Sequence, residues 1–416
     1  MDKMITFVSM IVWNEFRNDA RVLKEAETLQ AEGYEVTVHA LHTPGLIKER
    51  ETLGSGVRVV RVARSPLWKW RKRKASSLAR TVNTVSTRVA AGPIGKISLA
   101  RQVLRIVARI WTHLGLMVQM VKSRPDIVHA HDVNTLPTAW LVSVLTRSPL
   151  IYDAHEISTD REGYASFRKL VGWVEKRLMP RAAASITTTD TRAKFFARAY
   201  GISRPLVLQN RPRYESVDRS QRIRNELKLQ ETWPIVLYQG GIQQGRGLER
   251  LVEAAEQVSN AYFVFIGGGR IESVLKERVQ SLGLENRVYF IPTVSLVDLP
   301  SYTASADIGV QPIENTCLNH LSTDSNKLFE YMMAGLPIVA SSLPEIRKLV
   351  SVHELGLLVE PGNISELASA ICRLVDNDDL RHKFEKNAAI ASHYLSWDEQ
   401  ERALLSLYKD VLVGRY

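Results

Sequence analysis

The segment from Tyr238 to Leu248 combines closely spaced glycines with one arginine, a combination suited to binding a diphosphate. Gly240 and Gly241, with two later glycines, let backbone amides approach a ligand, and Arg246 adds a fixed positive charge. The helix predicted after this segment would present free N–H groups to the same anion. A tight turn between a strand and a helix, with no ligand, is the alternative interpretation.

A second candidate for binding an anion begins at Asp324, where Asp-Ser-Asn-Lys-Leu-Phe-Glu opens a predicted helix. Asp324 or Ser325 can cap this helix, which places Asn326 and Lys327 in its first turn. A lysine at this end opposes the helix dipole, and an anionic ligand would remove the conflict. Glu330 lies one turn later on nearly the same face, where a carboxylate suits ribose hydroxyls. The alternative is a surface ion pair between Lys327 and Glu330.

Two segments that contain histidine end apolar runs in the first half of the chain. Asp126 to Asp132 reads Asp-Ile-Val-His-Ala-His-Asp, and it predicts that His131 and Asp132 project from a strand end into a cleft. Tyr152 to Glu156 ends the next apolar run and points to the same place. A histidine there can donate a hydrogen bond or move a proton.

The same two segments also allow a metal site. The side chains with suitable ligand atoms are His129, His131, Asp132, His155 and Glu156. His129 and His131 share one face of a strand, but no cysteine pair and no helical His-Glu-x-x-His spacing supports zinc. We therefore expect no metal, and we interpret the Asp-Asn-Asp run at 376–378 as a helix cap.

Apolar runs of strand length alternate with amphipathic runs of helix length, which predicts parallel sheets with helices on both faces. In the first half, strands are expected at 4–10, 36–41, 57–62, 126–130, 150–152, 185–189 and 206–208, and helices at 19–31, 99–122, 135–145, 167–178 and 191–200. In the second half, strands are expected at 235–238, 262–266, 288–290, 308–310 and 338–340, and helices at 248–258, 271–281, 327–334, 365–375, 379–391 and 397–412. The polar segment 209–220 is the predicted linker. The predicted fold class is α/β, with two doubly wound Rossmann-like domains facing each other across a cleft.

Length and composition indicate an ordinary globular protein. The 416 residues suffice for two α/β domains, and a hydrophobic content of 45% gives no reason to expect long disorder. Cys317 and Cys372 cannot form a disulfide framework, and their scarcity fits a reducing compartment. The apolar run near the N-terminus lacks a small-residue cleavage site, so we interpret it as a buried strand rather than a signal peptide. No run reaches the length of a transmembrane helix.

Positive charge is concentrated in one part of the sequence. From Thr52 to Pro125 there is no Asp or Glu, and this segment holds 16 Lys and Arg. Without those 16, the 55 Lys and Arg fall to 39, against 44 Asp and Glu, so the rest of the chain is mildly acidic. A nucleic acid, an anionic membrane surface or a polyanionic acceptor could each account for such a segment.

Five segments in this order resemble glycosyltransferase family 4 of the GT-B superfamily, over nearly the whole chain. The segments are Asn18–Glu25, His129–Asp132, Tyr152–Glu156, Gly240–Gly247 and Asn326–Val339. The resemblance implies a GT-B fold in which residues 1–210 form an acceptor-binding domain and residues 211–395 bind a nucleotide-sugar. Residues 396–416 would form a helix that returns to the first domain.

The resemblance also implies roles for particular residues. Arg246 stands where the family usually has a lysine on the donor phosphates, and Glu330 matches a ribose-binding glutamate. The implied catalytic residues are His131, Arg246 and Lys327. The implied donor-binding residues are Gly240, Gly241, Arg246, Gly267, Gly268, Asn326, Lys327 and Glu330, and those on the acceptor side are Arg21, Asp132, His155 and Glu156.

Two positions depart from the usual pattern of the family. Gly241 stands where an arginine often follows the first glycine of the loop, and Ser322 stands where the family often has the first of two glutamates. One branch of the family replaces that glutamate pair with a loop ending in Asn-Lys-x-x-Glu, which residues 326–330 resemble. The missing glutamate normally holds the donor sugar, and Asp324 or a main-chain group is expected to take its place.

The resemblance implies a retaining hexosyltransferase that needs no metal or cofactor. It would move a sugar from a UDP or GDP donor to a saccharide or lipid-linked acceptor, in bacterial envelope or exopolysaccharide synthesis. One alternative is a nucleotide-sugar epimerase of the same fold, which would need paired carboxylates in the cleft. Another is a catalytically silent nucleotide-sugar-binding subunit, which Gly241 and Ser322 would fit.

Residues 64–109 are expected to contact an anionic membrane surface. Trp68–Lys74 mixes tryptophan with cations, and Arg101, Arg105 and Arg109 repeat every four residues to form a stripe. An ordinary solvated face is the alternative, and the lack of a known nucleic-acid motif argues against RNA or DNA. We expect a cytoplasmic protein, or one peripheral to the inner face of the plasma membrane.

Overall fold

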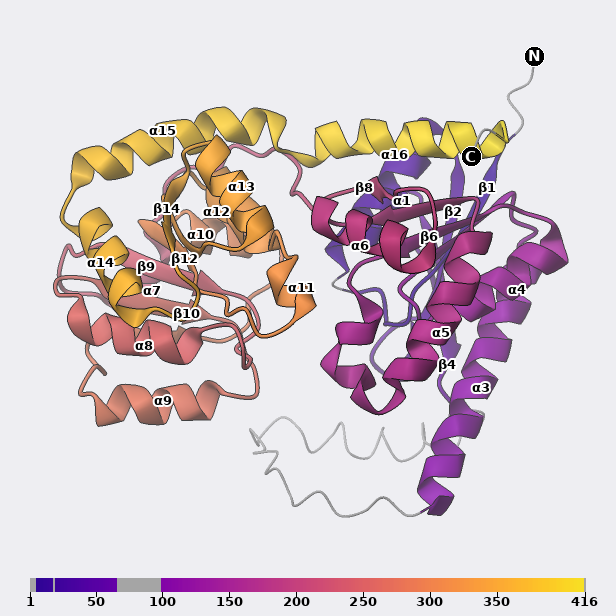
Figure 1. Ribbon diagram of the computed structural model, residues 1–416, viewed down its shortest axis with the longest axis horizontal. Coiled ribbons are helices and arrows are strands. Elements are labelled where there is room, and N and C mark those ends of the chain that lie inside the picture. Colours follow the sequence, from indigo (N-terminus) through magenta and orange to yellow (C-terminus); the bar gives the residue numbers. More distant parts are fainter. Residues whose placement is uncertain (1–4, 18, 66–98, 415–416) are drawn as a thin grey trace.

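Two parallel β-sheets, one in each half of the chain, form the framework of the molecule (Figure 1). The structure is a computed structural model, and it describes residues 5–17, 19–65 and 99–414. Each sheet separates two clusters of buried apolar side chains, so both faces of each sheet are covered. The prediction of two doubly wound α/β domains is confirmed.

In the described part of the chain, the N-terminal sheet has eight strands in the order β3-β4-β2-β1-β5-β6-β7-β8, and of these only β3 is antiparallel to its neighbour. The strands are β1 (Phe7–Ile11), β2 (Glu35–His42), β3 (Arg50–Thr52), β4 (Arg58–Ala63), β5 (Ile127–His131), β6 (Leu150–Ala154), β7 (Ala184–Thr187) and β8 (Leu206–Val207). The strands β5 and β6 are buried along their whole length, as the apolar runs indicate. The edge strand β3 was absent from the predicted elements because Arg-Glu-Thr is short and polar.

Within the described residues, five α-helices of the N-terminal half accompany this sheet. They are α1 (Ala20–Glu32), α3 (Leu99–Lys122), α4 (Leu136–Thr146), α5 (Arg168–Leu178) and α6 (Asp190–Tyr200). The start of α1 is fixed by Asp19, whose side chain accepts a hydrogen bond from the backbone N–H of Val22. Its end is fixed by Gly33, which adopts the left-handed conformation that glycine tolerates best.

The C-terminal sheet has six parallel strands in the order β11-β10-β9-β12-β13-β14. They are β9 (Ile235–Gln239), β10 (Tyr262–Ile266), β11 (Val288–Ile291), β12 (Ile308–Gln311), β13 (Ile338–Ser341) and β14 (Gly356–Val359). The helices of this domain are α7 (Arg222–Leu227), α8 (Leu248–Gln257), α9 (Glu272–Ser281), α10 (Leu299–Thr303), α11 (Leu318–Leu321), α12 (Asn326–Met333), α13 (Pro344–Val352), α14 (Ile364–Val375) and α15 (Asp378–Tyr394). The Asp-Asn-Asp run does cap a helix, because the Asn377 side chain accepts from the Leu380 N–H at the start of α15.

The last helix, α16 (Trp397–Leu412), follows α15 but packs against the N-terminal domain beside α1 (Figure 1). Trp397 anchors its start, because the buried indole N–H donates to the Thr28 hydroxyl at 2.9 Å. Leu404, Leu407 and Tyr408 belong to the core cluster of the N-terminal sheet. The end of the chain therefore ties the C-terminal domain to the N-terminal one.

Within the part of the chain that the structure describes, no helix combines the length and the apolar character that crossing a bilayer requires.

Candidate active site in the interdomain cleft

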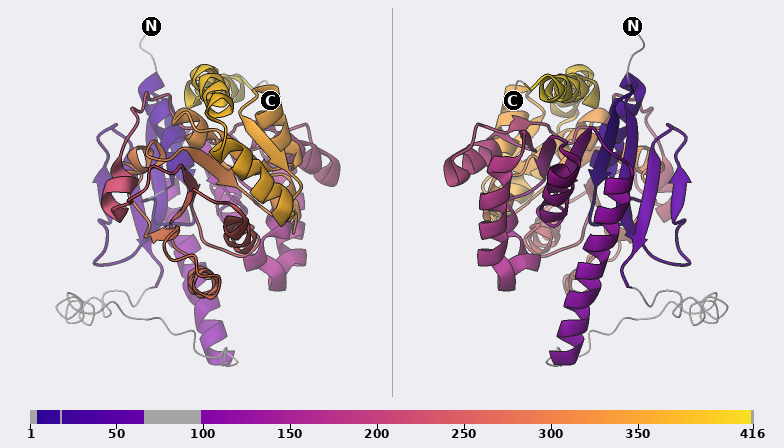
Figure 2. Two further views of the ribbon diagram at one scale, coloured as in Figure 1. Left: turned by 90° about the vertical axis from the view of Figure 1, so that its left-hand side faces the viewer. Right: turned by 90° about the vertical axis from the view of Figure 1, so that its right-hand side faces the viewer.

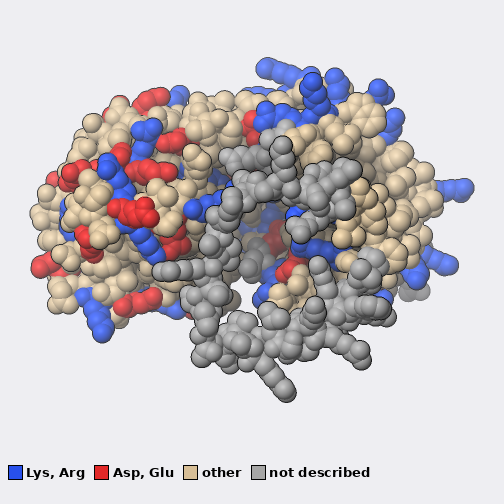
Figure 3. Space-filling view, turned by 90° about the horizontal axis from the view of Figure 1, so that it is seen from below, with Lys and Arg blue, Asp and Glu red and all other residues tan. Residues whose placement is uncertain are grey.

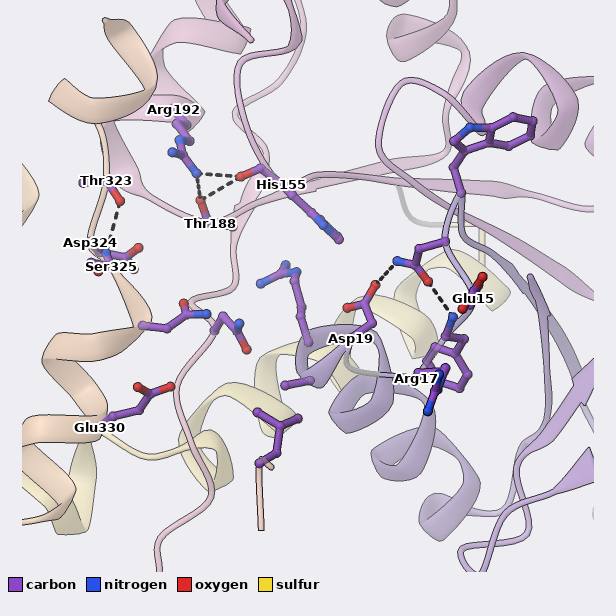
Figure 4. Close-up of a pocket in the computed structure, with 18 of the residues that line it drawn as sticks. Glu15, Arg17, Asp19, His155, Thr188, Arg192, Thr323, Asp324, Ser325 and Glu330 are labelled. Carbon is purple, nitrogen blue, oxygen red and sulfur yellow. Dashed lines mark hydrogen bonds between the residues drawn. The ribbon is translucent and has the colours of Figure 1, made fainter. Parts of the chain in front are cut away.

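A cavity of about 840 Å³ lies between the two domains, and both contribute to its wall (Figure 4). The N-terminal domain lines it with Trp13–Arg17, Asp19–Arg21, Arg64, His155, Thr188 and Arg192. The remaining wall is formed by Asn210, Leu296, Thr323–Asn326 and Glu330. In Figure 4, Glu330 and Asp324 come from one side, and Asp19 and Arg17 face them from the other.

The sheet topology explains the position of the cavity. In the N-terminal sheet, β1 lies between β2 and β5, and in the C-terminal sheet, β9 lies between β10 and β12. Open parallel sheets bind ligands beyond the carboxyl ends of their strands, where the strand order reverses. Trp13 follows β1, His155 follows β6, and Gly240 follows β9. The chemically active segments therefore gather at the two facing sheet edges.

The N-terminus of α12 forms one wall of the cavity. Ser325 precedes the helix with a φ of 43° and makes no side-chain cap bond to it. Its hydroxyl instead accepts a hydrogen bond from Gln311 Nε2 at 3.1 Å. Ser325 and Asn326 both line the cavity. The first-turn amides and the positive end of the helix dipole are thus left without a side-chain cap, which is the arrangement that binds phosphates.

Lys327 lies where the glycine-rich loop approaches α12. Its ammonium is 5.3 Å from the centre of the Tyr238 ring, and a Cβ on Gly240 would come within 2.8 Å of Lys327 Cε. The lysine end is flexible and could move aside, so it is the φ of 124° that favours glycine at position 240. Burial and then the nearby Arg246 lower the pKa of Lys327 to about 8. Two cations close together would both be stabilised by a diphosphate.

Glu330 is held in place by a residue of the C-terminal sheet. Gln239 ends β9, is 2% exposed, and donates from Nε2 to Glu330 Oε2 at 2.6 Å. The amide oxygen of Gln239 accepts from the Thr303 hydroxyl at 2.8 Å, which fixes the orientation of the amide. The carboxylate of Glu330 is therefore positioned at the cavity wall, where it can accept hydrogen bonds from hydroxyl groups.

A buried charged cluster forms the opposite side of the site. Arg21 donates to both carboxylate oxygens of Asp153, from Nε at 2.8 Å and from Nη2 at 3.0 Å. Arg21 Nε also lies 3.1 Å from Glu25 Oε1. His155 Nε2 lies 3.1 Å from Asp153 Oδ2, and the His155 side chain is 21% exposed. His155 is thus the histidine of this cluster that forms part of the cavity wall.

Asp153 sets the charge state of this cluster. Burial by itself would raise the pKa of Asp153, but Arg21 and His155 hold it well below its ordinary value. Burial opposes the charge on His155 as well, yet Asp153 and then Asp132 raise the pKa of His155 to about 9. Burial raises the pKa of Glu25 to about 8. At neutral pH the cluster therefore contains a carboxylate, a guanidinium and an imidazolium.

His131 lies behind His155 rather than in the open cleft. The sequence predicts that His131 projects into the cleft, but the structure leaves it 2% exposed and outside the cavity lining. Its Nδ1 lies 3.3 Å from His155 Nε2 and 3.5 Å from Asp153 Oδ2. Burial lowers the pKa of His131 despite Asp153, so its ring is neutral at physiological pH. Among the described residues, nothing hydrogen-bonds its Nε2.

His129 connects this cluster to the last helix of the chain. The rings of His129 and His131 stack with centres 4.2 Å apart. His129 Nδ1 forms a 2.7 Å hydrogen bond with the hydroxyl of Tyr408 on α16. Tyr408 is completely buried. The orientation of His131 therefore depends on a helix that follows the C-terminal domain in sequence.

One group of side chains has the composition of a metal site. Ligand atoms of Glu25, His129, His131 and Asp153 all lie within 4.8 Å of one another. Arg21 already contacts both carboxylates of this group and supplies the positive charge that a cation would bring. This group also differs from the one that the sequence suggests, because Asp132, His155 and Glu156 are not part of it. Because Arg21 already neutralises these carboxylates, we assign no metal ion to this group.

Several hydrogen bonds join the two domains around the cavity. The backbone N–H of Ile157 donates to Asn319 Oδ1 at 2.7 Å, and Asn319 Nδ2 returns a bond to the Ile157 carbonyl at 3.0 Å. Arg192 Nε donates to the Ser322 hydroxyl at 3.1 Å. Asp324 accepts from Gln209 Nε2 at 3.0 Å, and burial raises the pKa of its carboxyl. The cleft is therefore in a closed arrangement.

The structure places only part of the sequence-predicted set in the cavity wall. Of the predicted set, the cavity wall includes Arg21, His155, Asn326 and Glu330. The predicted residues outside the lining are His131, Asp132, Glu156, Gly240, Gly241, Arg246, Lys327, Gly267 and Gly268. Gly267 packs on the backbone of Gly240, so the loops after β9 and β10 touch. Asp132 and Glu156 lie 3.8 and 3.5 Å from Arg161, which pairs with both carboxylates.

Sequence reasoning also missed residues that position the site, among them Asp153, Gln239 and Arg192. Asp153 lies inside a motif that was recognised. The available signal was its place beside Tyr152 in a buried strand. Gln239 is a polar residue at the end of an apolar strand, which is another such signal. Arg192 in the first turn of α6 gave no local signal, because its contacts with Ser322 and Asn319 come from the other domain.

Comparison with known proteins agrees with this architecture. Residues 19–211 match the family described as glycosyl transferase 4-like domain, and residues 219–390 match glycosyl transferases group 1. A D-inositol 3-phosphate glycosyltransferase from Corynebacterium glutamicum is 22% identical over 94% of this chain and 91% of its own length.

Two solved structures share the fold. Sucrose-phosphate synthase from Thermosynechococcus elongatus superposes with a TM-score of 0.77 at 18% identity, covering 98% of this chain and all of the other. The Anabaena protein HepE, in complex with UDP-glucose, gives a TM-score of 0.71 at 17% identity and covers 97% and 99% of the two chains. With both halves of the chain matched in this order, and with two Rossmann-like domains around one cleft, the chain belongs to the GT-B glycosyltransferases of family 4 type.

Proposed function

We propose that this glycosyltransferase is a retaining hexosyltransferase that takes its sugar from a UDP or GDP donor. The observation that carries the proposal is the α12 wall of the cleft, where an uncapped helix N-terminus, Lys327 and the oriented carboxylate of Glu330 lie together. The helix and Lys327 fit a diphosphate, and Glu330 fits the adjacent ribose. The UDP-glucose in the similar HepE structure is consistent with such a donor.

The acceptor would enter from the N-terminal domain. We propose a hydroxyl of a saccharide or a lipid-linked saccharide, in bacterial envelope or exopolysaccharide synthesis, at the cytoplasmic face of the membrane. Arg17, Asp19 and Arg64 line this side of the cavity and offer donors and acceptors to a polyhydroxylated ligand. On this assignment, Asp132, His155 and Glu156 define the acceptor side, with Arg161 linking Asp132 to Glu156.

The charges of the site suit departure of a diphosphate. As the bond from the anomeric carbon to the phosphate breaks, negative charge grows on the phosphate and positive charge on the sugar ring. Lys327, Arg246 and the N-terminus of α12 would stabilise the phosphate as it leaves. A phosphate oxygen on the same face of the sugar would then accept the proton of the attacking hydroxyl. This route retains the anomeric configuration and requires no metal ion.

The N-terminal cluster would hold the reacting sugar. His131 would hydrogen-bond a sugar hydroxyl through its Nε2, which has no partner among the described residues, and Asp153 fixes the orientation of both histidines. We assign the role of the missing first glutamate to Asp324, because Ser322 lies outside the cavity lining and its hydroxyl accepts a hydrogen bond from Arg192. Asp324 lines the cavity and lies on the donor side.

Proton NMR of the reaction products tests this proposal. Nucleotide-diphosphate hexoses with an α linkage are incubated with the protein, and the anomeric signal of the transferred or released sugar is recorded before mutarotation. We expect the α anomer together with free nucleotide diphosphate. The β anomer would contradict retention, and an isomerised donor that keeps its nucleotide would indicate an epimerase. A donor that binds and is never consumed would indicate a binding subunit.

A further inference from the structure

Three neighbouring helices of the N-terminal domain expose an unusual amount of apolar surface. About half of the exposed large apolar side chains in the described residues lie on α3, α4 and α5 or directly before α5. On α3 they include Leu104 and Ile106, which are 63% and 59% exposed. On α4, Leu145 is 62% exposed, and on α5, Trp173 is 59% exposed. Single exposed apolar residues are ordinary, but a continuous surface of them indicates an interaction site.

These helices lie side by side on one face of the molecule. α3 packs beside α4, and α4 packs beside α5. Figure 2 (right) shows the three helices in a row facing the viewer. Their apolar side chains recur three and four residues apart, as in Val107, Ile110 and Leu114, so each helix turns one apolar stripe outward. We call this surface the α3–α5 face.

The charge of the α3–α5 face has one sign. The three helices contain a single acidic residue, Glu175, which is buried and accepts hydrogen bonds from Tyr152 and Tyr200. The exposed charges are basic and include Arg168, Lys169 and Arg177. The Arg177 guanidinium lies 5.9 Å from the centre of the Trp173 ring. In Figure 3 the N-terminal domain is largely tan with blue around it, whereas red gathers on the C-terminal domain.

The geometry points to an anionic lipid bilayer as the partner: we propose that the α3–α5 face docks on such a membrane. Basic side chains can pair with lipid phosphates while leucine, isoleucine and tryptophan enter the interface, a combination typical of peripheral membrane proteins. A second copy of this chain would bring two arrays of like charge together. A nucleic acid would leave the apolar side chains in water.

The position of this face connects it to the cleft. His113 on α3 stacks on Trp13 with ring centres 4.2 Å apart, and the Arg109 guanidinium lies 5.2 Å from the centre of the same ring. Trp13 lines the cavity on the acceptor side. Docking would therefore bring the acceptor side of the cleft close to the membrane, within reach of a lipid-linked hydroxyl. The expected membrane segment, residues 64–109, overlaps this face only in part, because residues 66–98 lie outside the described structure.

This proposal names a partner for the transferase proposed above, but its test contains no sugar, so the two can fail separately. The full chain is floated with vesicles of phosphatidylcholine alone or mixed with phosphatidylglycerol, at low and at high salt. We expect binding to the mixed vesicles that weakens at high salt, and at least tenfold less binding to phosphatidylcholine alone. No binding to mixed vesicles at low salt would overturn the proposal, as would equal binding to both kinds of vesicle.

Two double variants on α5 identify the surface. Arg168→Glu with Lys169→Glu should weaken binding by about 25-fold or more, since each basic residue near an anionic surface contributes about fivefold. Leu170→Ser with Trp173→Ser should weaken it by at least about tenfold. All four side chains are exposed, and thermal unfolding checks that the fold is intact.

Matched controls come from exposed residues of the C-terminal domain. They are Lys348→Glu with Lys386→Glu for charge and Val274→Ser with Val297→Ser for apolar area. We expect both controls to bind vesicles like the unmodified chain. Equal binding by the α5 variants and the controls would overturn the proposal. A dimer in sedimentation that the Leu170→Ser and Trp173→Ser variant dissolves would also overturn it, by showing that a second copy covers this face.

Discussion

At the scale of single residues, the site contains two cations that lie near each other and a buried ring nitrogen without a hydrogen-bond partner in the described residues. Lys327 lies beside Gly240 and near Arg246, and its pKa is lowered to about 8 in the unliganded protein. His131 is neutral, buried, and has an Nε2 without a hydrogen-bond partner in the described part of the chain. Buried polar groups are normally satisfied, so such exceptions indicate where a ligand completes the structure.

The lowered pKa of Lys327 predicts that a nucleotide diphosphate binds with uptake of a proton. The free lysine loses its charge as the pH rises through about 8, whereas the bound diphosphate favours the charged form and raises the pKa. Affinity should therefore be highest below pH 8 and fall above it. Calorimetry at pH 8.5 in buffers of different ionisation enthalpy measures the uptake. Lys327→Met should abolish it, and an uptake unchanged in that variant would show that another group titrates.

We predict that His131→Ala lowers turnover but leaves nucleotide binding almost unchanged. The side chain lies in the N-terminal cluster, away from the wall assigned to the diphosphate, so its loss should lower kcat about 100-fold or more. The dissociation constant of the nucleotide diphosphate should change by less than about threefold. His382→Ala, an exposed histidine of α15, is the matched control. A variant that loses nucleotide binding would contradict the assigned role.

The sequence could predict the donor side of the site better than the opposite side. Lys327 and Glu330 are separated by one helical turn and follow a cap signal, so local spacing placed them together. The cluster around Asp153 depends on Arg21, which is 132 residues away in the sequence and contacts Asp153 through the tertiary fold. The depth of His131 could not be predicted either, because the ring that covers it comes from the next strand.

At the scale of elements, α12 and α16 position residues of the candidate site. The uncapped start of α12 lies at the cavity, and the last helix, α16, supports the histidines through Tyr408. Long, strongly patterned elements such as α3 and β10 could be predicted to the residue. The helices α7, α10, α11 and α13 and the strand β14 were missed. Most are short, and their apolar patterns are too brief for a period to show, although Pro344 does mark the start of α13.

If α16 positions the buried charged cluster, Tyr408→Phe should disturb it. Loss of the hydroxyl leaves the buried Nδ1 of His129 without its partner, which should lower the free energy of unfolding by about 1–3 kcal/mol. The stacked His131 should then be less well oriented, so kcat should fall while the nucleotide dissociation constant stays unchanged. Chemical unfolding and steady-state kinetics measure both effects. Tyr214→Phe, a more exposed tyrosine, is the control. Loss of stability with an unchanged kcat would make the role of Tyr408 purely structural.

At the scale of the whole molecule, the two domains meet through a small set of polar contacts around the cleft. Asn319 of α11 exchanges two hydrogen bonds with the backbone of Ile157, and its own N–H donates to Asp160 at 2.9 Å. Thr191 donates to Glu345 from its N–H at 2.7 Å and from its hydroxyl at 2.5 Å. Polar contacts of this kind hold domains together less firmly than an apolar core, so opening and closing of the cleft is expected. The covalent link through α15 and α16 limits that motion.

We predict that Asn319→Ala shifts the population of molecules toward an open cleft. The variant loses the two side-chain hydrogen bonds to Ile157, worth about 1 kcal/mol each, which corresponds to about a 30-fold loss in the closed population. Small-angle scattering without nucleotide should show a larger radius of gyration than for the unmodified chain. Asn286→Ala, on the exposed surface of the C-terminal domain, should leave the scattering unchanged. Identical scattering from Asn319→Ala and the unmodified chain would mean that these contacts do not hold the cleft closed.

The central claim is that the α12 wall of the cleft binds a nucleotide diphosphate, and a calorimetric titration tests it most directly. UDP and GDP are titrated into the unmodified chain, into Lys327→Met and Glu330→Gln, and into Lys348→Met as a control on the exposed surface. We predict that the unmodified chain and the control bind one of the two nucleotides alike. Lys327→Met and Glu330→Gln should each bind it at least about tenfold more weakly, because each removes a charge-assisted contact worth about 1.5–3 kcal/mol. Binding of neither nucleotide, or equal binding by all four proteins, would contradict the account.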